Sequence, residues 1–151
     1  DLEGHEVLQA RLQTPGGHNV QNALAALAAA TACGTPLSAA VEALAGFQGI
    51  RRRMEVVGER KGNVVIDDFG HNPDKIAATL TALHAFPGRV LALFQPSGYG
   101  PLALARKELV ESFAANLKGG DVLFMPDPVF ANIGKLLLVY RPAEEPKLRL
   151  P

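Results

Sequence analysis

Short apolar runs that alternate with helix-forming stretches constrain the fold of this chain more than any other feature. Three of these runs have the length and composition of buried strands: Val64–Ile66, Val90–Phe94 and Asp121–Met125. Residues 73–86 and 101–117 separate them and are expected to be helices. This β-α-β-α-β order predicts an α/β fold, with a Rossmann-like, mostly parallel sheet flanked by helices. Leu136–Tyr140 can supply one more strand, but the proline-rich end cannot be a central one.

The first 48 residues differ in character from the rest. Residues 1–14 alternate weakly in hydrophobicity, as an edge strand entering a turn would. Two helices are expected next, Asn19–Cys33 and a shorter one from Pro36 to Ala45. Phe47–Glu55 carries three consecutive arginines and is expected to be a linker. The chain therefore divides into a helical segment, residues 1–48, and a larger domain, residues 49–151.

Composition excludes several classes of protein. Hydrophobic residues make up 48% of the chain and charged residues 20%, which suits a packed core rather than a disordered chain. Lys+Arg and Asp+Glu both number 15, so no overall attraction to nucleic acid or to an anionic membrane is expected. The single cysteine, Cys33, excludes an internal disulfide, and no leader or membrane span is evident. We expect a cytoplasmic protein.

Two clusters of polar residues lie at boundaries between predicted elements. Asn19 and Asn22 are three residues apart, so their amides lie on one face of a first helical turn and suit the edge of an adenine. The alternative is that Asn19 only caps the helix. In the second cluster, Arg51–Arg53, three adjacent guanidiniums cannot all point one way. At most one or two of them can meet a phosphate, and a solvated basic patch is the alternative.

A third cluster, Asp67–Asp74, follows the strand Val64–Ile66 and precedes a helix. In α/β proteins, ligands bind at the carboxyl ends of parallel strands. A carboxylate there can hold ribose hydroxyls, and a histidine or a helix N-terminus can approach a phosphate. Capping by Asn72 or Asp74 explains part of this cluster, but not Asp68 together with His71. We expect the Asp68 carboxylate to face a crevice and to contribute little to folding.

In this order and at these separations, the three clusters resemble the Mur ligase superfamily, which also holds folylpolyglutamate synthetase. The motifs are Gly-x-His-Asn-x-x-Asn, Arg-Arg-x-Glu and Asp-Asp-Phe-Gly-His-Asn-Pro, and the match runs from about Thr14 to Pro128. Such enzymes use ATP and Mg²⁺ to activate a substrate carboxylate as an acyl phosphate, and an amine then displaces the phosphate. The resemblance implies the following contacts with ATP: adenine by Asn19 and Asn22, the phosphates by Arg53, the ribose by Asp68, and the ribose and α-phosphate by His71.

Within the superfamily, the Asp-Asp-aromatic-Gly-His run and Phe94-Gln95-Pro96 are similar to ligases of peptidoglycan synthesis, which add an amino acid or a peptide to UDP-N-acetylmuramate. In these relatives the loop after Gln-Pro faces the incoming amine, which implies substrate contacts for Ser97 and Tyr99. Ligases that add alanine are expected to have His-Arg-Tyr there, whereas this chain has Ser97-Gly98-Tyr99. The added group is therefore left open between alanine, a tripeptide and another amine.

The sequence contains no Gly-x-x-Gly-Lys-Thr/Ser phosphate loop. The resemblance therefore implies that residues 1–48 are the tail of a central ATP-binding domain and that residues 49–151 are the carboxy-terminal domain, with an atypical tail from Ala131. Magnesium ligands are expected in the missing central domain. The chain alone is expected to be inactive, and apolar surface without its partner domains is expected to self-associate. The alternative is a non-catalytic nucleotide-binding or interaction module.

Overall fold

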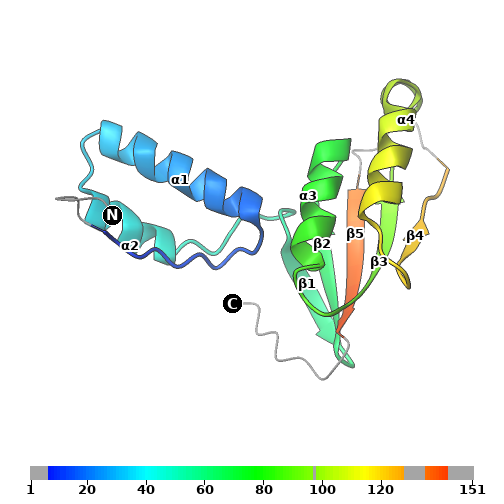
Figure 1. The fold of residues 1–151 in the computed structure, drawn as a ribbon, viewed down its shortest axis with the longest axis horizontal. Helices are drawn as coiled ribbons and strands as arrows, with labels where there is room; N and C mark the ends of the chain where they lie inside the picture. Colours follow the sequence, from blue (N-terminus) through cyan, green and yellow to red (C-terminus); the bar gives the residue numbers. More distant parts are fainter. Residues whose placement is uncertain (1–6, 97, 128–134, 143–151) are drawn as a thin grey trace. The chain divides into compact units, whose positions relative to one another are not determined.

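The computed structural model describes residues 7–96, 98–127 and 135–142. The backbone divides into two compact units, the first ending at Gly49 and the second beginning at Ile50 (Figure 1). Among the described residues, no helix is both long enough and apolar enough to span a bilayer.

The first unit is a pair of helices, α1 (Gly17–Ala32) and α2 (Leu37–Ala45). Gly16, with φ 102°, precedes α1, and Gly34, with φ 90°, follows it, because both turns need a left-handed backbone that glycine adopts without strain. Both predicted helices are confirmed. The edge strand predicted within residues 1–14 is wrong over its described part, since residues 7–12 have no regular structure.

Apolar side chains remain at the surface of the helix pair. Val20 is 50% exposed, Leu24 is 61% exposed and Phe47 is 45% exposed, while Ala23 and Ala40 are the buried positions of α1 and α2. Val20 and Leu24 also line an apolar hollow together with Leu12, Leu27 and Leu44. Small alanines let the two helices approach each other, but they bury little apolar area.

We predict that this surface makes the chain self-associate. Replacing Leu24 and Phe47 with serine should shift the protein toward the monomer, because the exposed apolar area that favours association is reduced. Sedimentation velocity over a concentration series measures the change, with Cys33→Ser as an exposed control. A wild-type chain that stays monomeric up to millimolar concentration would contradict the prediction.

The second unit is a five-stranded sheet with two helices (Figure 1). The strands follow the order β1-β2-β5-β3-β4 across the sheet. In chain order, the elements are β1 (Glu55–Arg60), β2 (Asn63–Asp68), α3 (Pro73–Leu83), β3 (Gly88–Gln95), α4 (Tyr99–Asn116), β4 (Val122–Phe124) and β5 (Lys135–Pro142). The α/β class and the sheet packed against helices are confirmed.

The mostly parallel pairing expected from the sequence needs correction. β2, β3 and β4 do run in one direction, but β5 lies between β2 and β3 and pairs antiparallel with both. Only β3 and β4 form a parallel pair. The last strand enters the centre of the sheet because Leu136, Leu138 and Tyr140 provide apolar side chains at every second position, which a doubly paired strand can bury.

The strand β1 was missed and lies where a linker was expected to end. It pairs antiparallel with β2 through a two-residue turn, Lys61-Gly62, whose φ angles are 51° and 73°. Positive φ at both central residues is typical of the tight hairpin turn that matches strand twist. Lys61-Gly62 was the available sequence signal. In the structure, the pairing of β1 with β2 is irregular between Val56 and Gly58.

Both helices of the second unit pack on the same face of the sheet. Thr79 of α3 bonds to Asp68 of β2, and Phe113 of α4 stacks edge-on against Phe94 of β3 with ring centroids 5.4 Å apart. Asp68 and Phe94 share a face because Leu136 of β5 lies opposite each of them. The hydrophobic core is therefore the layer between this face and α3 with α4.

A side-chain hydrogen bond fixes β5 beside the start of β3. Tyr140 is 2% exposed, and its hydroxyl donates to the Pro87 carbonyl over 2.6 Å. Burial raises the pKa of Tyr140, so the hydroxyl keeps its proton and remains a donor. A Cβ at Gly88 would lie 2.4 Å from the Arg141 carbonyl and 2.8 Å from the Tyr140 ring. This position therefore accepts only glycine.

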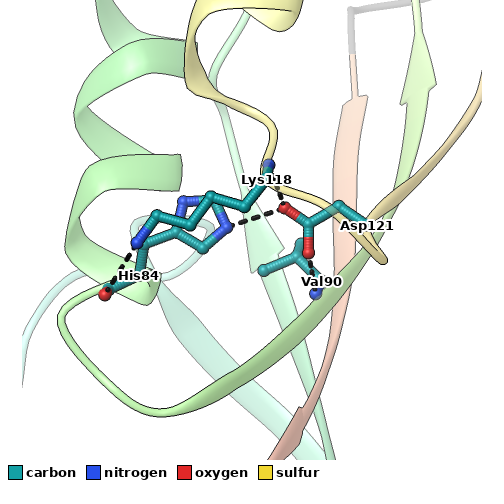
Figure 2. A network of polar contacts seen from close by, with 4 residues as sticks. All are labelled: His84, Val90, Lys118 and Asp121. Carbon is teal, nitrogen blue, oxygen red and sulfur yellow. Dashed lines mark hydrogen bonds and ion pairs between the residues drawn. The ribbon is translucent and has the colours of Figure 1, made fainter.

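At the same end of β3, a buried carboxylate joins three segments (Figure 2). Asp121 accepts from the backbone N–H groups of Val90 and Lys118, both over 2.7 Å, and from His84 Nε2 over 2.8 Å. The side chains of His84 and Asp121 are 7% and 1% exposed. Burial alone would raise the pKa of Asp121, but the hydrogen bonds from Val90, Lys118 and His84 together hold it below its ordinary value.

We predict that Asp121→Asn lowers the free energy of unfolding by about 1.5–3 kcal/mol at neutral pH, because a charged acceptor of three hydrogen bonds is replaced by an amide that turns a donor toward another donor. Urea denaturation measures the loss. Asp127→Asn removes an exposed carboxylate and is the control.

The stability difference between wild type and Asp121→Asn should also depend on pH. The pKa of Asp121 is lower in the folded than in the unfolded state, so its contribution is present above the ordinary value of 3.8 and is lost as pH falls through the folded pKa. The stability difference between wild type and Asp121→Asn should therefore shrink in acid. A difference that stays constant from about pH 7 to about pH 2 would contradict this account.

Candidate nucleotide site

The hairpin of β1 and β2 brings the arginine cluster to the carboxyl end of β2. Glu55, the first residue of β1, lies opposite Asp67 near the end of β2. The residues just before β1 therefore lie beside the loop that follows β2. Two clusters that the sequence places about 15 residues apart thus form one site, and antiparallel pairing is the physical reason.

The three arginines point in different directions, as their adjacency requires. The Arg51 side chain is 95% exposed, with Nε 3.9 Å from Glu55 Oε1. Arg52 is half-buried, with Nε 3.9 Å from Asp67 Oδ2. Arg53 is exposed, and no ion pair joins it to a carboxylate within the described part of the chain.

Residues 50–54 form a turn, called the arginine turn below, whose strained backbone is held by specific hydrogen bonds. Arg52 and Met54 have φ angles of 59° and 53°, which side chains of this size rarely adopt. Such a conformation costs on the order of 1–3 kcal/mol per residue and persists only where neighbouring contacts enforce it. Here the Arg52 carbonyl accepts from Phe69 N over 2.8 Å, and the Arg52 N–H donates to Glu55 Oε2 over 2.8 Å.

Phe69 lies at the centre of the site. The Arg52 and Arg53 guanidinium carbons are 4.9 Å and 5.5 Å from the centre of its ring, within the range of a cation–π contact. The His71 ring lies beside it, with centroids 4.8 Å apart at an interplanar angle of 56°. Sequence reasoning gave neither Phe69 nor Arg52 a role, although the run of arginines and the aromatic before Gly70 were the available signals.

Hydrogen bonding fixes the tautomer of His71. Its Nδ1 lies 3.0 Å from the Phe69 carbonyl, which can only accept, so Nδ1 carries the hydrogen. In the neutral ring, Nε2 is then an acceptor for a hydroxyl, and in the protonated ring it is a donor for a phosphate oxygen. The next residue, Asn72, caps α3 by accepting from Lys75 N over 2.9 Å. The capping role considered for Asn72 is therefore present.

Asp68 does not face a crevice, which corrects the expectation from the sequence. It is the last residue of β2 and is 5% exposed, on the face that α3 covers. Its two carboxylate oxygens accept from Met54 N over 2.9 Å and from Thr79 Oγ1 over 3.2 Å. The physical reason is strand alternation, because Asp68 shares its face with the buried Ile66. Asp68 thus ties the arginine turn to α3.

Tyr99 belongs to the same edge of the sheet. It is the first residue of α4 and is 52% exposed, following β3 as the Phe69–His71 loop follows β2. The carboxyl ends of β2 and β3 lie at one edge because both strands run in the same direction. Ser97 lies outside the described residues.

Asn19 and Asn22 lie in the first unit, one helical turn apart on α1. Gly16 is the N-cap of α1 and makes no side-chain cap, so Asn19 is not the capping residue. Its amide instead donates to the Pro15 carbonyl over 2.6 Å, and Asn22 is exposed.

The described residues contain no group of three or more His, Cys, Asp or Glu side chains that could hold a metal ion. The chemistry at the sheet edge is that of two guanidiniums, an aromatic ring and an imidazole. Such a set suits a ligand that carries phosphate groups.

Comparison with known proteins identifies the family. Residues 52–134, more than half of the chain, match the domain described as Mur ligase, glutamate ligase domain. The chain belongs to the Mur ligase family. Its arginine turn, hairpin and Phe69–His71 loop all lie within or directly beside the matched region of this Mur ligase domain.

Relatives cover most of this Mur ligase chain. It is 42% identical over 146 residues to the UDP-N-acetylmuramate–L-alanine ligase of Nitrosomonas europaea, covering 92% of this chain and 28% of that protein. Identity to the corresponding ligase of Mycolicibacterium vanbaalenii is 42% over 125 residues, covering 80% of this chain and 25% of that protein. This chain spans about a quarter of the length of these relatives.

A solved structure has a similar fold. The crystal structure of UDP-N-acetylmuramate-alanine ligase from Thermotoga maritima superposes with a TM-score of 0.57 at 29% identity. The match covers 82% of this chain and 32% of that one.

The burial of Asp68 leads to a prediction about stability. We expect Asp68→Asn to lower the free energy of unfolding by about 1.5–3 kcal/mol, because a buried charged acceptor loses strength toward Met54 N. Thermal melts measure the effect, with Asp74→Asn as an exposed control. An ATP titration of the same variants separates the two roles. If ATP affinity is unchanged while the melting temperature falls, Asp68 is a structural residue and does not hold the ribose.

Proposed function

We propose that the chain is the carboxy-terminal part of an ATP-dependent ligase of peptidoglycan synthesis. Such an enzyme joins an amino acid or a peptide to a UDP-N-acetylmuramate-type substrate in the cytoplasm. The observation that carries the proposal is the gathering of Arg53, Phe69 and His71 at the carboxyl edge of the sheet, within a chain of the Mur ligase family.

The proposed reaction has two steps. A carboxylate oxygen of the substrate attacks the γ-phosphorus of ATP, ADP leaves, and an acyl phosphate forms. The amine of the amino acid or peptide then attacks the acyl carbon, phosphate leaves with the bonding electrons, and the nitrogen gives up one proton to the released phosphate or to water as the amide forms. Mg²⁺ would neutralise phosphate charge in the first step, and we propose that its ligands lie in a domain outside this chain.

The proposal assigns a binding role to six residues of this chain. Arg53 is exposed and carries guanidinium donors suited to phosphate oxygens. His71 Nε2 can bond to a ribose hydroxyl or to the α-phosphate. Asn19 and Asn22, on α1, are proposed for the adenine. Ser97 and Tyr99, after β3, are proposed for the incoming amine. Asp68 has no part in this proposal, because it is 5% exposed and both of its oxygens accept hydrogen bonds inside the protein.

The first test concerns the chain alone. We predict no ATP hydrolysis and no amide formation above a blank, because the phosphate loop that would hold the triphosphate does not occur in this sequence. Phosphate release with ATP, Mg²⁺, UDP-N-acetylmuramate and alanine is the measurement. Turnover by the purified chain would show that it needs no other domain.

A chimera tests the function itself. The aligned carboxy-terminal part of the Nitrosomonas europaea ligase is replaced by this chain, and substrate-dependent phosphate release is measured with alanine, other amino acids and a tripeptide. We expect activity with one of these amines, and none from the same ligase truncated before the replaced part. A folded chimera that binds ATP but is inactive with every amine would favour a non-catalytic nucleotide-binding module.

Two matched variants of the chimera locate the phosphate contact. Arg53→Ala should reduce kcat/KM for ATP by on the order of 10- to 100-fold, the loss expected for a hydrogen bond to a charged group. Arg51→Ala should have little effect, because this side chain is 95% exposed and directed to Glu55. Equal effects of both substitutions would contradict a specific role for Arg53.

A further inference from the structure

Two neighbouring arginines share one aromatic ring, yet their surroundings differ. The Arg52 side chain is 37% exposed and lies between the Phe69 ring and the Asp67 carboxylate. Its backbone is also fixed, since its carbonyl accepts from Phe69 N and its N–H donates to Glu55. Arg52 is therefore a structural part of the turn.

Arg53 has a different set of contacts. Its N–H donates to the Ile50 carbonyl over 3.1 Å, which closes the turn, and its guanidinium lies over the Phe69 ring. A guanidinium over an aromatic face uses the π system, and its five N–H donors at the edge stay available. A carboxylate partner would have occupied two of these donors. The aromatic contact thus orients the group without consuming its hydrogen bonds.

On this basis we propose that Phe69 is the positioning residue of the phosphate site. Its ring holds the Arg53 guanidinium in the orientation that receives phosphate oxygens. Arg52, held by Asp67 and by the Phe69 N–H, stabilises the backbone of the turn. The inference rests on the proposed nucleotide function of this edge. It deepens that function by assigning the residue that prepares the arginine before the ligand arrives.

Pre-organisation is the physical gain. A free arginine side chain must lose rotamer freedom when it binds an anion, and a side chain already held in place loses less. The backbone of the turn is fixed by Asp68 and Phe69 through Met54 N and the Arg52 carbonyl. The rotamer of the Arg53 side chain then remains to be fixed, and the Phe69 ring is the group in contact with its guanidinium.

The first measurement needs no ligand. In a ¹H–¹⁵N spectrum of the 151-residue chain, the Arg53 Nε–H signal should show a ring-current shift, because the guanidinium lies over the Phe69 face. The shift should vanish in Phe69→Leu and remain in Phe69→Tyr, which keeps the ring. An Arg53 signal at the position of an exposed arginine such as Arg51 in the wild-type chain would overturn the proposal.

The second measurement is a titration of the same chain with ATP and, separately, with inorganic tripolyphosphate, followed by the same spectra. We expect Phe69→Leu to weaken both ligands by roughly two- to five-fold, the effect expected for an exposed cation–π contact. Phe69→Tyr should bind like wild type. The double variant Phe69→Leu with Arg53→Ala should bind no more weakly than Arg53→Ala alone.

The outcomes separate this inference from the proposed function. If ATP binds with a dependence on Arg53 but Phe69→Leu has no effect, the positioning role is wrong and the nucleotide site stands. If Phe69→Leu weakens ATP but not tripolyphosphate, the ring contacts the nucleoside instead, which also overturns the positioning role. If neither ligand binds to the wild-type chain or to the chimera with the Nitrosomonas europaea ligase while the ring-current shift is present, the contact between Phe69 and Arg53 stands and the nucleotide function of this edge fails.

Discussion

The antiparallel pairing of β5 with two neighbours holds the second unit together. Without β5, the β1–β2 hairpin would have no hydrogen-bonded link to β3 and β4, and Phe94 and Ile66 would not share one core. The pairing depends on a close approach at Gly88, where Tyr140 reaches the Pro87 carbonyl. Because β5 links the two halves of the sheet, the loops after β2 and β3 open at one edge.

The candidate site depends on the same framework through Asp68. A buried carboxylate is costly unless it is hydrogen-bonded, and Asp68 meets this need by binding Met54 N and Thr79. One side chain thus links the strained arginine turn, the end of β2 and helix α3. Asp68 lies in a family motif, yet its contacts in this structure are internal. The motif residues that a ligand can reach are Arg53 and His71. The residues proposed to bind a ligand and the residues that hold them are different parts of one motif.

Much of the architecture followed from local patterns. The apolar runs of β2, β3 and β4, the glycines and prolines at the ends of α1 and α2, and the cap at Asn72 report on neighbours in sequence, so they predict elements well. Two strands were harder. β1 was not predicted, and its first residue, Glu55, was taken for the end of a linker because Arg51–Arg53 interrupt the pattern. β5 was not assigned a place because strand order depends on contacts between distant residues. Arg53 and His71 were found through motifs, whereas the ring that connects them was not.

By itself, the sequence determined the α/β class, the two helices of the first unit, the absence of a phosphate loop and the motifs of the Mur ligase family. These follow from composition, periodicity and residue order, which need no knowledge of distant contacts. Only the tertiary structure decided that Asp68 points into the core, that β5 separates β2 from β3, and that Phe69 lies under two guanidiniums. Side-chain direction and strand order are set by which distant segments pack together, and no local pattern encodes that choice.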